Sequence, residues 1–207
     1  MGILENKARA RFFYKYLSKV YDRINPYIWN EEMRTEALAL LDFSDDDMVL
    51  DVGCGTGFAT EGLLEHVDTV YALDQSEHQL EKAYEKFGRT GGPVHFHRGD
   101  AERLPFATNA FDTVWSSGSI EYWPQPVRTL REFRRVLVPG GQVLVVGPNS
   151  PSGFVARTLA DAMMLFYDEY EADRMFKTAG FEDVRHKFMG PSYEPEVAIT
   201  TVARAPE

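Results

Sequence analysis

The sequence predicts an α/β domain whose mostly parallel sheet carries helices on both faces. Short apolar strands alternate with amphipathic helices along the chain, and a glycine-rich turn at residues 53–57 directly follows the strand that ends at Val52. Asp74 closes the next strand roughly twenty residues later. Because parallel strands end at the same edge of a sheet, this layout predicts a nucleoside site at that edge.

Two helices are predicted before the first strand. Between residues 10 and 24 apolar side chains recur every three or four positions with charges between them, which is typical of an amphipathic helix. A second helix is predicted over residues 31–41. The acidic run at residues 44–47 then predicts a polar loop that leads into the sheet.

The centre of the chain alternates between strands and helices. Apolar runs predict strands over residues 48–52, 69–73, 94–98, 113–116 and 142–146, and helical spacing predicts helices over residues 59–65, 77–86 and 126–136. The segment Pro139-Gly140-Gly141 predicts a stop and a turn between the last of these helices and the strand at residues 142–146.

The pattern changes after Pro148. A helical stretch over residues 154–179 precedes strand-like segments at 182–188 and 196–203, which predicts seven strands of which the last is antiparallel. No internal repeat or linker divides the chain, so we expect a single domain over residues 1–207. Within it we expect a helical lid at 1–42, a cofactor-binding core at 43–149, and a substrate-side helix with the final strands at 150–207.

The composition agrees with a folded domain that does not bind nucleic acid. A length of 207 residues with 44% hydrophobic residues is enough for one full core. The formal net charge of -10 opposes binding to a phosphate backbone. The single cysteine, Cys54, excludes an internal disulfide, and we expect it to be a small turn residue rather than a nucleophile.

The first 25 residues are basic, unlike the rest of the chain. Their helix could rest on an anionic bilayer, or it could be an ordinary lid with a solvated charged face. Neither a signal-peptide core nor a run long enough to span a bilayer is present in the sequence. We therefore expect a cytoplasmic protein, with peripheral contact at the inner face of the membrane under the first alternative. The sequence indicates no oligomeric state.

The charge around the glycine turn distinguishes the nucleoside ligands. Gly53 and Gly55 allow a tight reversal and a close approach of the backbone to a ligand. Asp51, just ahead of the turn, would repel the pyrophosphate of a dinucleotide, whereas Asp74 can accept hydrogen bonds from ribose hydroxyls. S-adenosylmethionine carries an ammonium and a sulfonium and no phosphate, so this turn favours it over NAD.

Each of these residues also has a simpler explanation. The glycines could be plain turn residues, Asp51 could be a helix N-terminal charge, and Asp74 could cap the following helix. The distance between the glycine turn and the acidic residue makes the combination more specific than any single member.

Two later segments extend the predicted cofactor site. Asp100 and the N–H group of Ala101 follow the third strand and can bind an adenine edge, although Asp100 could instead cap a helix. The small residues 116–119 follow the fourth strand and leave room for a methyl acceptor. The predicted cofactor contacts are Asp51, Gly53, Cys54, Gly55, Asp74, Gln75, Asp100, Ala101 and Ser117.

Together these segments resemble the class I S-adenosylmethionine-dependent methyltransferases, whose fold is Rossmann-like. The chain looks most like the branch that methylates prenylated benzoquinols such as 2-methyl-6-phytylbenzoquinol. This closer resemblance rests above all on Gly118-Ser119-Ile120-Glu121-Tyr122-Trp123-Pro124 and extends to about Pro191. It implies methyl transfer to a ring carbon of a prenylated quinol, with S-adenosylhomocysteine as the second product.

The chain departs from that branch in two places. Cys54 stands where a second glycine is common, and the acidic stretch at residues 192–196 replaces a basic one. We further expect neither a plastid-type targeting segment nor a C-terminal membrane anchor. These two expected absences, rather than the residue differences, lead us to expect a prokaryotic relative whose quinone is a menaquinone rather than a tocopherol or plastoquinone precursor.

Glu121 is the candidate catalytic base. Loss of a phenolic proton would make the neighbouring ring carbon a better nucleophile, and Glu121 follows the fourth strand directly. The rings of Tyr122 and Trp123 could hold the aromatic acceptor. The alternative is that Glu121 caps a helix or acts on the cofactor indirectly.

Other aromatic, methionine and histidine residues are less specific. An isoprenoid tail could contact Tyr14, Tyr21, Trp29, Met163, Met164, Phe166 and Tyr167, although such residues at helical spacing often belong to a core. His95 and His97 lie on one face of a strand, but without a third ligand at a recognisable spacing we expect them to pack locally and expect no metal.

Three other functions stay open. The protein could methylate oxygen or nitrogen of another small aromatic acceptor, it could bind the cofactor as a regulator without turnover, or it could be a dinucleotide oxidoreductase.

Overall fold

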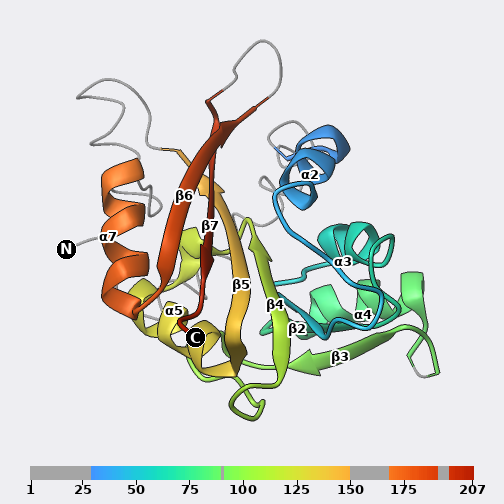
Figure 1. Cartoon of the computed structure of the whole chain (residues 1–207). Helices are drawn as coiled ribbons and strands as arrows, with labels where there is room; N and C mark the ends of the chain where they lie inside the picture. The colour runs from blue at the N-terminus through green and yellow to red at the C-terminus, as the bar shows by residue number, and fades with distance from the viewer. Residues whose placement is uncertain (1–28, 90, 150–167, 191–195) are drawn as a thin grey trace.

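The structure is a computed structural model that describes residues 29–89, 91–149, 168–190 and 196–207. A seven-stranded sheet with the order β3-β2-β1-β4-β5-β7-β6 forms its centre (Figure 1). The strands are β1 (Val49–Val52), β2 (Val70–Asp74), β3 (Val94–Arg98), β4 (Phe111–Ser117), β5 (Leu137–Pro148), β6 (Glu182–Met189) and β7 (Ala198–Arg204). The helices are α2 (Glu31–Leu38), α3 (Phe58–Leu63), α4 (Glu77–Phe87), the short 3₁₀ helix η1 (Ile120–Tyr122), α5 (Pro126–Val136) and α7 (Glu169–Ala179).

Strand direction confirms the predicted fold class. From β3 to β5 neighbouring strands pair in parallel, whereas β7 is inserted between β5 and β6 and runs antiparallel to both. The last strand is therefore antiparallel, as the sequence predicts. The order of the strands reverses between β1 and β4, and in sheets of this kind ligands bind at that switch point, beyond the carboxyl ends of the strands.

Alternate residues of the central strands supply two cores. On one face α5 and α7 pack against Leu50, Val114 and Val143. On the other face α2 and α3 cover Trp115 and Leu144, and α4 lies beyond them over β2 and β3. Figure 1 shows the two sets of helices on opposite sides of the sheet. Because both faces are covered, most side chains of the central strands are apolar and buried, and the edge beyond the carboxyl ends of the strands is where a ligand can bind.

Helix α2 belongs to one of these core layers. Its buried face, Met33, Ala37 and Leu38, packs on the sheet, and Asn30 caps its N-terminus by accepting from the Met33 N–H group at 2.9 Å. Residues 1–28 of the predicted lid at 1–42, including the helix at 10–24, lie outside the described residues, as does the chain from 150 to 167. The lid and the membrane contact of the N-terminal helix stay predictions. Among the described residues, no helix is both long enough and apolar enough to span a bilayer.

A buried arginine joins α2 to α3. The Arg34 guanidinium donates to the Phe58 carbonyl oxygen at 2.8 Å, lies 4.6 Å from the centre of the Phe58 ring and 3.5 Å from a carboxylate oxygen of Glu61. A methyl group on Gly62 would come within 2.7 Å of Arg34 Nε, so the two helices are in close contact here. Arg34 therefore fixes the helix that directly follows the glycine turn.

The sequence placed the start of β5 too late. The predicted turn at Pro139-Gly140-Gly141 lies within the strand, which already begins at Leu137. Leu137 pairs with Phe111 and Gln142 with Thr113, so the residues between them form an irregularity in the ladder, with φ of 72° at Gly140. The proline and glycines mark a bulge rather than the end of an element.

We expect Arg34→Ala to lower the free energy of unfolding by about 2 kcal/mol, because it removes a charged hydrogen bond and leaves a gap between α2 and α3. Urea denaturation would measure the change. Glu36→Gln on the same helix is the matched control, since Glu36 pairs with Lys187 while both side chains are 43% exposed; its effect should stay below about 0.5 kcal/mol. Equal effects of the two substitutions would contradict the anchoring role of Arg34.

Candidate functional site

The glycine turn follows β1 and is attached to β2. The backbone N–H groups of Gly53 and Cys54 both donate to the Leu73 carbonyl oxygen, at 2.7 and 3.1 Å. Gly53 has a φ of 77°, and a Cβ atom there would lie 2.6 Å from Ser119 Cβ. Gly55 has a φ of 55°, but no atom lies within 4 Å of a Cβ built on it. The turn is therefore closed against β4 at Gly53 and open to a ligand at Gly55.

Asp74 holds the open part of the turn. Its carboxylate accepts from the Gly55 N–H group at 2.9 Å and from the Ser76 N–H group at 2.7 Å. Burial raises the pKa of Asp74. The alternative that Asp74 caps the next helix is wrong, because Ser76 is the N-cap of α4 and accepts from the Gln79 N–H group. A third backbone hydrogen bond comes from Gln75. An ionised carboxylate has about four acceptor sites, so Asp74 keeps capacity for a ribose hydroxyl.

Asp51 lies beneath the turn and is only 1% exposed. Thr60, in the first turn of α3, donates its hydroxyl to Asp51 Oδ2 at 2.6 Å. Burial, with a smaller contribution from the charge of Asp74, raises the pKa of Asp51 from 3.8 to about 7. The contact with α3 agrees with the simpler explanation of Asp51 as a helix N-terminal charge. Its position under the glycines also allows its charge to favour a cation above the turn.

Cys54 is buried in the turn. Burial, followed by the charges of Asp51 and Asp74, raises the pKa of its thiol well above the usual value. The thiol is therefore protonated at neutral pH and is a poor nucleophile. This agrees with the interpretation of Cys54 as a small turn residue.

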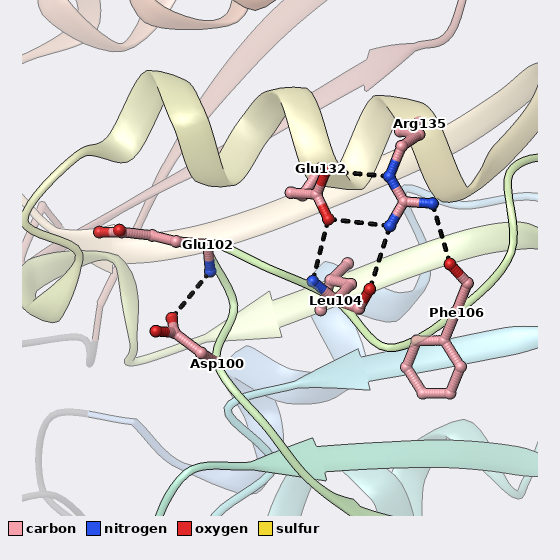
Figure 2. A network of polar contacts seen from close by, with 6 residues as sticks. All are labelled: Asp100, Glu102, Leu104, Phe106, Glu132 and Arg135. Atoms are coloured by element: carbon pink, nitrogen blue, oxygen red, sulfur yellow. Dashed lines mark hydrogen bonds and ion pairs between the residues drawn. The ribbon is translucent and has the colours of Figure 1, made fainter.

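The loop after β3 brings Asp100 and Ala101 to the same edge of the sheet. Asp100 Oδ1 accepts from the Glu102 N–H group at 3.0 Å and closes a tight turn (Figure 2). The described chain continues from this turn into a loop and β4 rather than into a helix, so Asp100 is not a helix cap. The position agrees with the predicted adenine contact, which stays a prediction.

Side chains of helix α5 hold the loop that follows β3 in place. Figure 2 shows Glu132 accepting from the Leu104 N–H group at 2.9 Å, while the Arg135 guanidinium donates to the carbonyl oxygens of Leu104 and Phe106. The hydrogen bond from Arg135 keeps the pKa of Glu132 below its usual value. Glu102 adds a link to the start of α5 by accepting from the Gln125 N–H group at 3.1 Å. The predicted adenine loop is thus held against α5 by several hydrogen bonds between side chains and backbone groups.

The segment after β4 is less open than the sequence predicts. Ser116 is fully buried and donates to the Val52 carbonyl oxygen at 2.7 Å, and its Oγ lies 2.6 Å from Ser119 Oγ. Ser117 Oγ accepts from the Trp115 indole N–H group at 3.1 Å. Ser117 and Ser119 are half-buried, and Ser119 lies against Gly53 of the turn.

Glu121 and Tyr122 lie in η1, and Trp123 directly follows it. The three side chains differ in their burial and packing. Glu121 is fully buried and Tyr122 is half-buried. Trp123 is 5% exposed and packs edge-to-face on Phe133, with ring centres 5.2 Å apart. This packing is sufficient to explain Trp123 as a core residue, and its predicted contact with the substrate stays a prediction.

Of the residues predicted to contact an isoprenoid tail, only Trp29 is described. It is half-buried and packs on the core beneath α2. Tyr14, Tyr21, Met163 and Phe166, together with Met164 and Tyr167, lie outside the described residues.

An open cavity of about 530 Å³ lies on the other half of the sheet, beside α7 and β6, with further walls from the residues that follow β5 and precede β7. Its walls combine carboxylates with aromatic rings and one histidine, namely Asn149, Asp168, Glu169, Tyr170, Asp173, His186, Phe188 and Glu196. Burial lowers the pKa of His186, and its Nδ1 lies 2.9 Å from Thr201 Oγ1. The cavity belongs to the part of the chain that was predicted to face the substrate.

His95 and His97 pack against the ring of Tyr71, with centre distances of 4.8 and 5.9 Å. His97 also contacts Phe106 edge-to-face. In the described ranges no three histidine, cysteine or acidic side chains gather in a way that could hold a metal ion. Packing on neighbouring aromatic rings is a sufficient explanation for the presence of two histidines on this face of β3.

Sequence reasoning missed the partners that hold the predicted site residues. Thr60 is the donor to Asp51, and Glu132 with Arg135 fixes the loop after β3. A buried carboxylate requires a donor, so a search for a hydroxyl in the helix after the turn could have found Thr60. Nothing in the local sequence pairs the residues of α5 with a loop about thirty positions earlier.

The comparisons with known proteins agree with this geometry. A family model described as a methyltransferase domain matches residues 50–145. The chain is 47% identical, over 194 residues and 92% of its length, to the chloroplastic 2-methyl-6-phytyl-1,4-hydroquinone methyltransferase 1 of Oryza sativa subsp. japonica. It spans 58% of the length of that relative.

Two further matches cover nearly all of the compared chains. A demethylmenaquinone methyltransferase of Staphylococcus aureus is 30% identical over 212 residues, which cover 87% of this chain and 88% of the relative. A solved complex of the Haloferax volcanii Trm112 methyltransferase activator with a putative methyltransferase contains a chain that matches with a TM-score of 0.78 and 21% identity, over 96% of this chain and 98% of that one. The structural match supports the fold.

We expect Gly53→Ala to lower the free energy of unfolding by about 3 kcal/mol, because strain at positive φ adds to a clash with Ser119. Gly55→Ala is the matched control, with positive φ and open space, and should cost about 1 kcal/mol. Chemical denaturation of both variants would measure the difference. A cost for Gly55→Ala as large as that for Gly53→Ala would show that the contact with Ser119 is not tight.

We expect the stability difference between the wild type and Asp51→Asn to depend on pH. Because the folded pKa of Asp51 is about 7 and its ordinary value is 3.8, the native state holds this proton more tightly than the unfolded state. The stability contributed by Asp51 is therefore complete below pH 4 and is lost as pH rises to about 7, by roughly 4 kcal/mol. Urea denaturation of the ligand-free proteins between pH 4 and 8 would measure it. Parallel pH profiles of the two proteins would contradict the raised pKa.

Proposed function

The chain belongs to the S-adenosylmethionine-dependent methyltransferases, and we propose that it methylates a ring carbon of a prenylated hydroquinone. The observation that carries this proposal is the 47% identity to a 2-methyl-6-phytyl-1,4-hydroquinone methyltransferase over 92% of the chain. The demethylmenaquinone methyltransferase is 30% identical, so similarity favours a benzoquinol acceptor over the menaquinol that the sequence led us to expect.

The cofactor fits the residues around the glycine turn. Open space at Gly55 leaves room for a ligand against the backbone, and Asp74 keeps acceptor capacity for a ribose hydroxyl beside its three backbone hydrogen bonds. Asp51 and Asp74 place negative charge beside a site for a cationic ligand. When bound, S-adenosylmethionine supplies an electrophilic methyl group on a sulfonium. The chain's own part is to orient that group and to hold the acceptor in line with it.

Glu121 is our candidate for the base that takes the phenolic proton. Glu121 lies in η1, two residues after Ser119. Ser119 in turn rests against Gly53 of the cofactor turn. The candidate base is thus close in sequence to a residue in contact with the turn. Removing the phenolic proton raises the electron density of the ring carbon that attacks the methyl group. The ring carbon takes the methyl group from sulfur, which keeps the electron pair of the broken bond, and the ring carbon then loses its own proton so that the ring becomes aromatic again. The complete burial of Glu121 would keep competing water away from this step.

The cavity beside α7 supports a neutral acceptor with hydroxyl groups. Asp168, Glu169, Asp173 and Glu196 on its walls would repel an anionic substrate and can accept from phenolic hydroxyls. Tyr170 and Phe188 add exposed aromatic surface for an apolar tail.

We expect labelled methyl groups to pass from S-adenosylmethionine to 2-methyl-6-phytyl-1,4-hydroquinone faster than to the tail-less ring, with the label on carbon. Mass spectrometry of the product would locate the methyl group, and demethylmenaquinol would serve as the competing acceptor. Glu121→Gln should lower kcat by a factor of about 10² to 10⁴. Its affinity for S-adenosylmethionine, measured by calorimetry, should stay unchanged.

Glu36→Gln, a substitution of the same kind in an exposed ion pair, is the control and should leave kcat unchanged. Label on oxygen or nitrogen would replace the proposed reaction with methylation of another atom. Tight cofactor binding without transfer to any quinol would favour a regulator without turnover.

A further inference from the structure

The hydrogen bonds of Ser116 fix the direction of the Ser119 hydroxyl. Ser116 Oγ lies 2.7 Å from the Val52 carbonyl oxygen and 2.6 Å from Ser119 Oγ. A carbonyl oxygen can only accept, so the single hydroxyl hydrogen of Ser116 points to Val52. The contact between the two serines then requires Ser119 to donate to Ser116. Ser119 Oγ is left with lone pairs and no hydrogen on its remaining sides.

Ser119 also lies at a defined part of the ligand site. Its side chain rests against Gly53, the first glycine of the turn after β1, and is half-buried. Asp74 at the end of β2 and Asp100 after β3 mark the nucleoside end of the site. In the strand order β3-β2-β1-β4, the other end of the cofactor therefore extends across β1 toward β4, where Ser119 lies.

We propose that Ser119 Oγ faces the sulfonium of bound S-adenosylmethionine and makes the protein discriminate the charged cofactor from its neutral product. This inference rests on the proposed function. A lone-pair oxygen is attracted to the sulfonium and to its polarised methyl C–H bonds, but it gains little from the thioether of S-adenosylhomocysteine. The serine pair prevents the Ser119 hydrogen from turning toward the positive charge. Ser116 is accordingly a positioning residue, because it acts through Ser119.

The consequence is a preference that disappears after transfer. Before the reaction the Ser119 oxygen stabilises the charged cofactor, and after the methyl group has left, the same oxygen faces an uncharged sulfur. The product is then held less tightly at this contact, which favours its exchange for a new cofactor molecule.

The test is calorimetric binding of S-adenosylmethionine and S-adenosylhomocysteine to the full chain and to Ser119→Ala. We expect the substitution to weaken S-adenosylmethionine about fivefold while the affinity for S-adenosylhomocysteine stays the same. Equal weakening of both ligands would place Ser119 against a part that they share and would overturn the proposal. Unchanged affinity for both ligands would overturn it as well.

Ser116→Ala provides a second, independent measurement. Without the Ser116 oxygen, the Ser119 hydrogen is free to turn outward, so the preference for the charged ligand should again fall. In the double variant the preference should be no lower than in Ser119→Ala alone, because Ser116 acts only through Ser119. An additive loss would overturn the positioning role.

Failure of the proposed function gives a different result. A wild-type protein that binds neither ligand would contradict the cofactor assignment. A wild type that binds S-adenosylmethionine but methylates no hydroquinone would contradict the acceptor and leave the role of Ser119 to the binding data.

Discussion

The carbonyl oxygens at the ends of β1 and β2 are the constraint on which the site depends. Leu73 accepts from the two backbone N–H groups that begin the glycine turn, and Val52 accepts from Ser116 of β4. These contacts connect three neighbouring strands at the edge where their order reverses. They also bring Ser119 so close to Gly53 that a side chain at that position has no room. These hydrogen bonds therefore shape the glycine turn, which is closed at Gly53 and open at Gly55.

Charge adds a second constraint at the same place. Asp51 is fully buried and Asp74 half-buried beside the glycine turn, and burial raises the pKa of both. The charge of Asp74 further disfavours the ionised form of Asp51, and a cation bound at the turn would relieve that cost. Thr60 and the backbone N–H groups of Gly55 and Ser76 partly stabilise the carboxylates. The ligand-free site is thus electrostatically prepared for a positively charged partner.

Helix α5 connects the two halves of the sheet. On one side Glu132 and Arg135 hold the loop that carries Asp100, and on the other side Leu130 and Phe133 share a core with Phe176 of α7. The 3₁₀ helix with Glu121 lies between these contacts and directly precedes α5 in the chain. The cofactor half and the half with the acidic cavity are therefore supported by one rigid element. Such support keeps reacting groups aligned without a contact from α5 to either ligand.

The sequence by itself determined the alternation of strands and helices, the antiparallel last strand and the glycine–aspartate arrangement, because these depend on hydrophobic period and local spacing. It was wrong about the start of β5, since a proline and two glycines in a bulge resemble a turn. Only the tertiary structure decided that Thr60 holds Asp51, that Trp123 belongs to the core, and that Ser116 orients Ser119. Each of these contacts depends on how separate elements pack together or on which side chains become buried. The local sequence pattern contains no information on either.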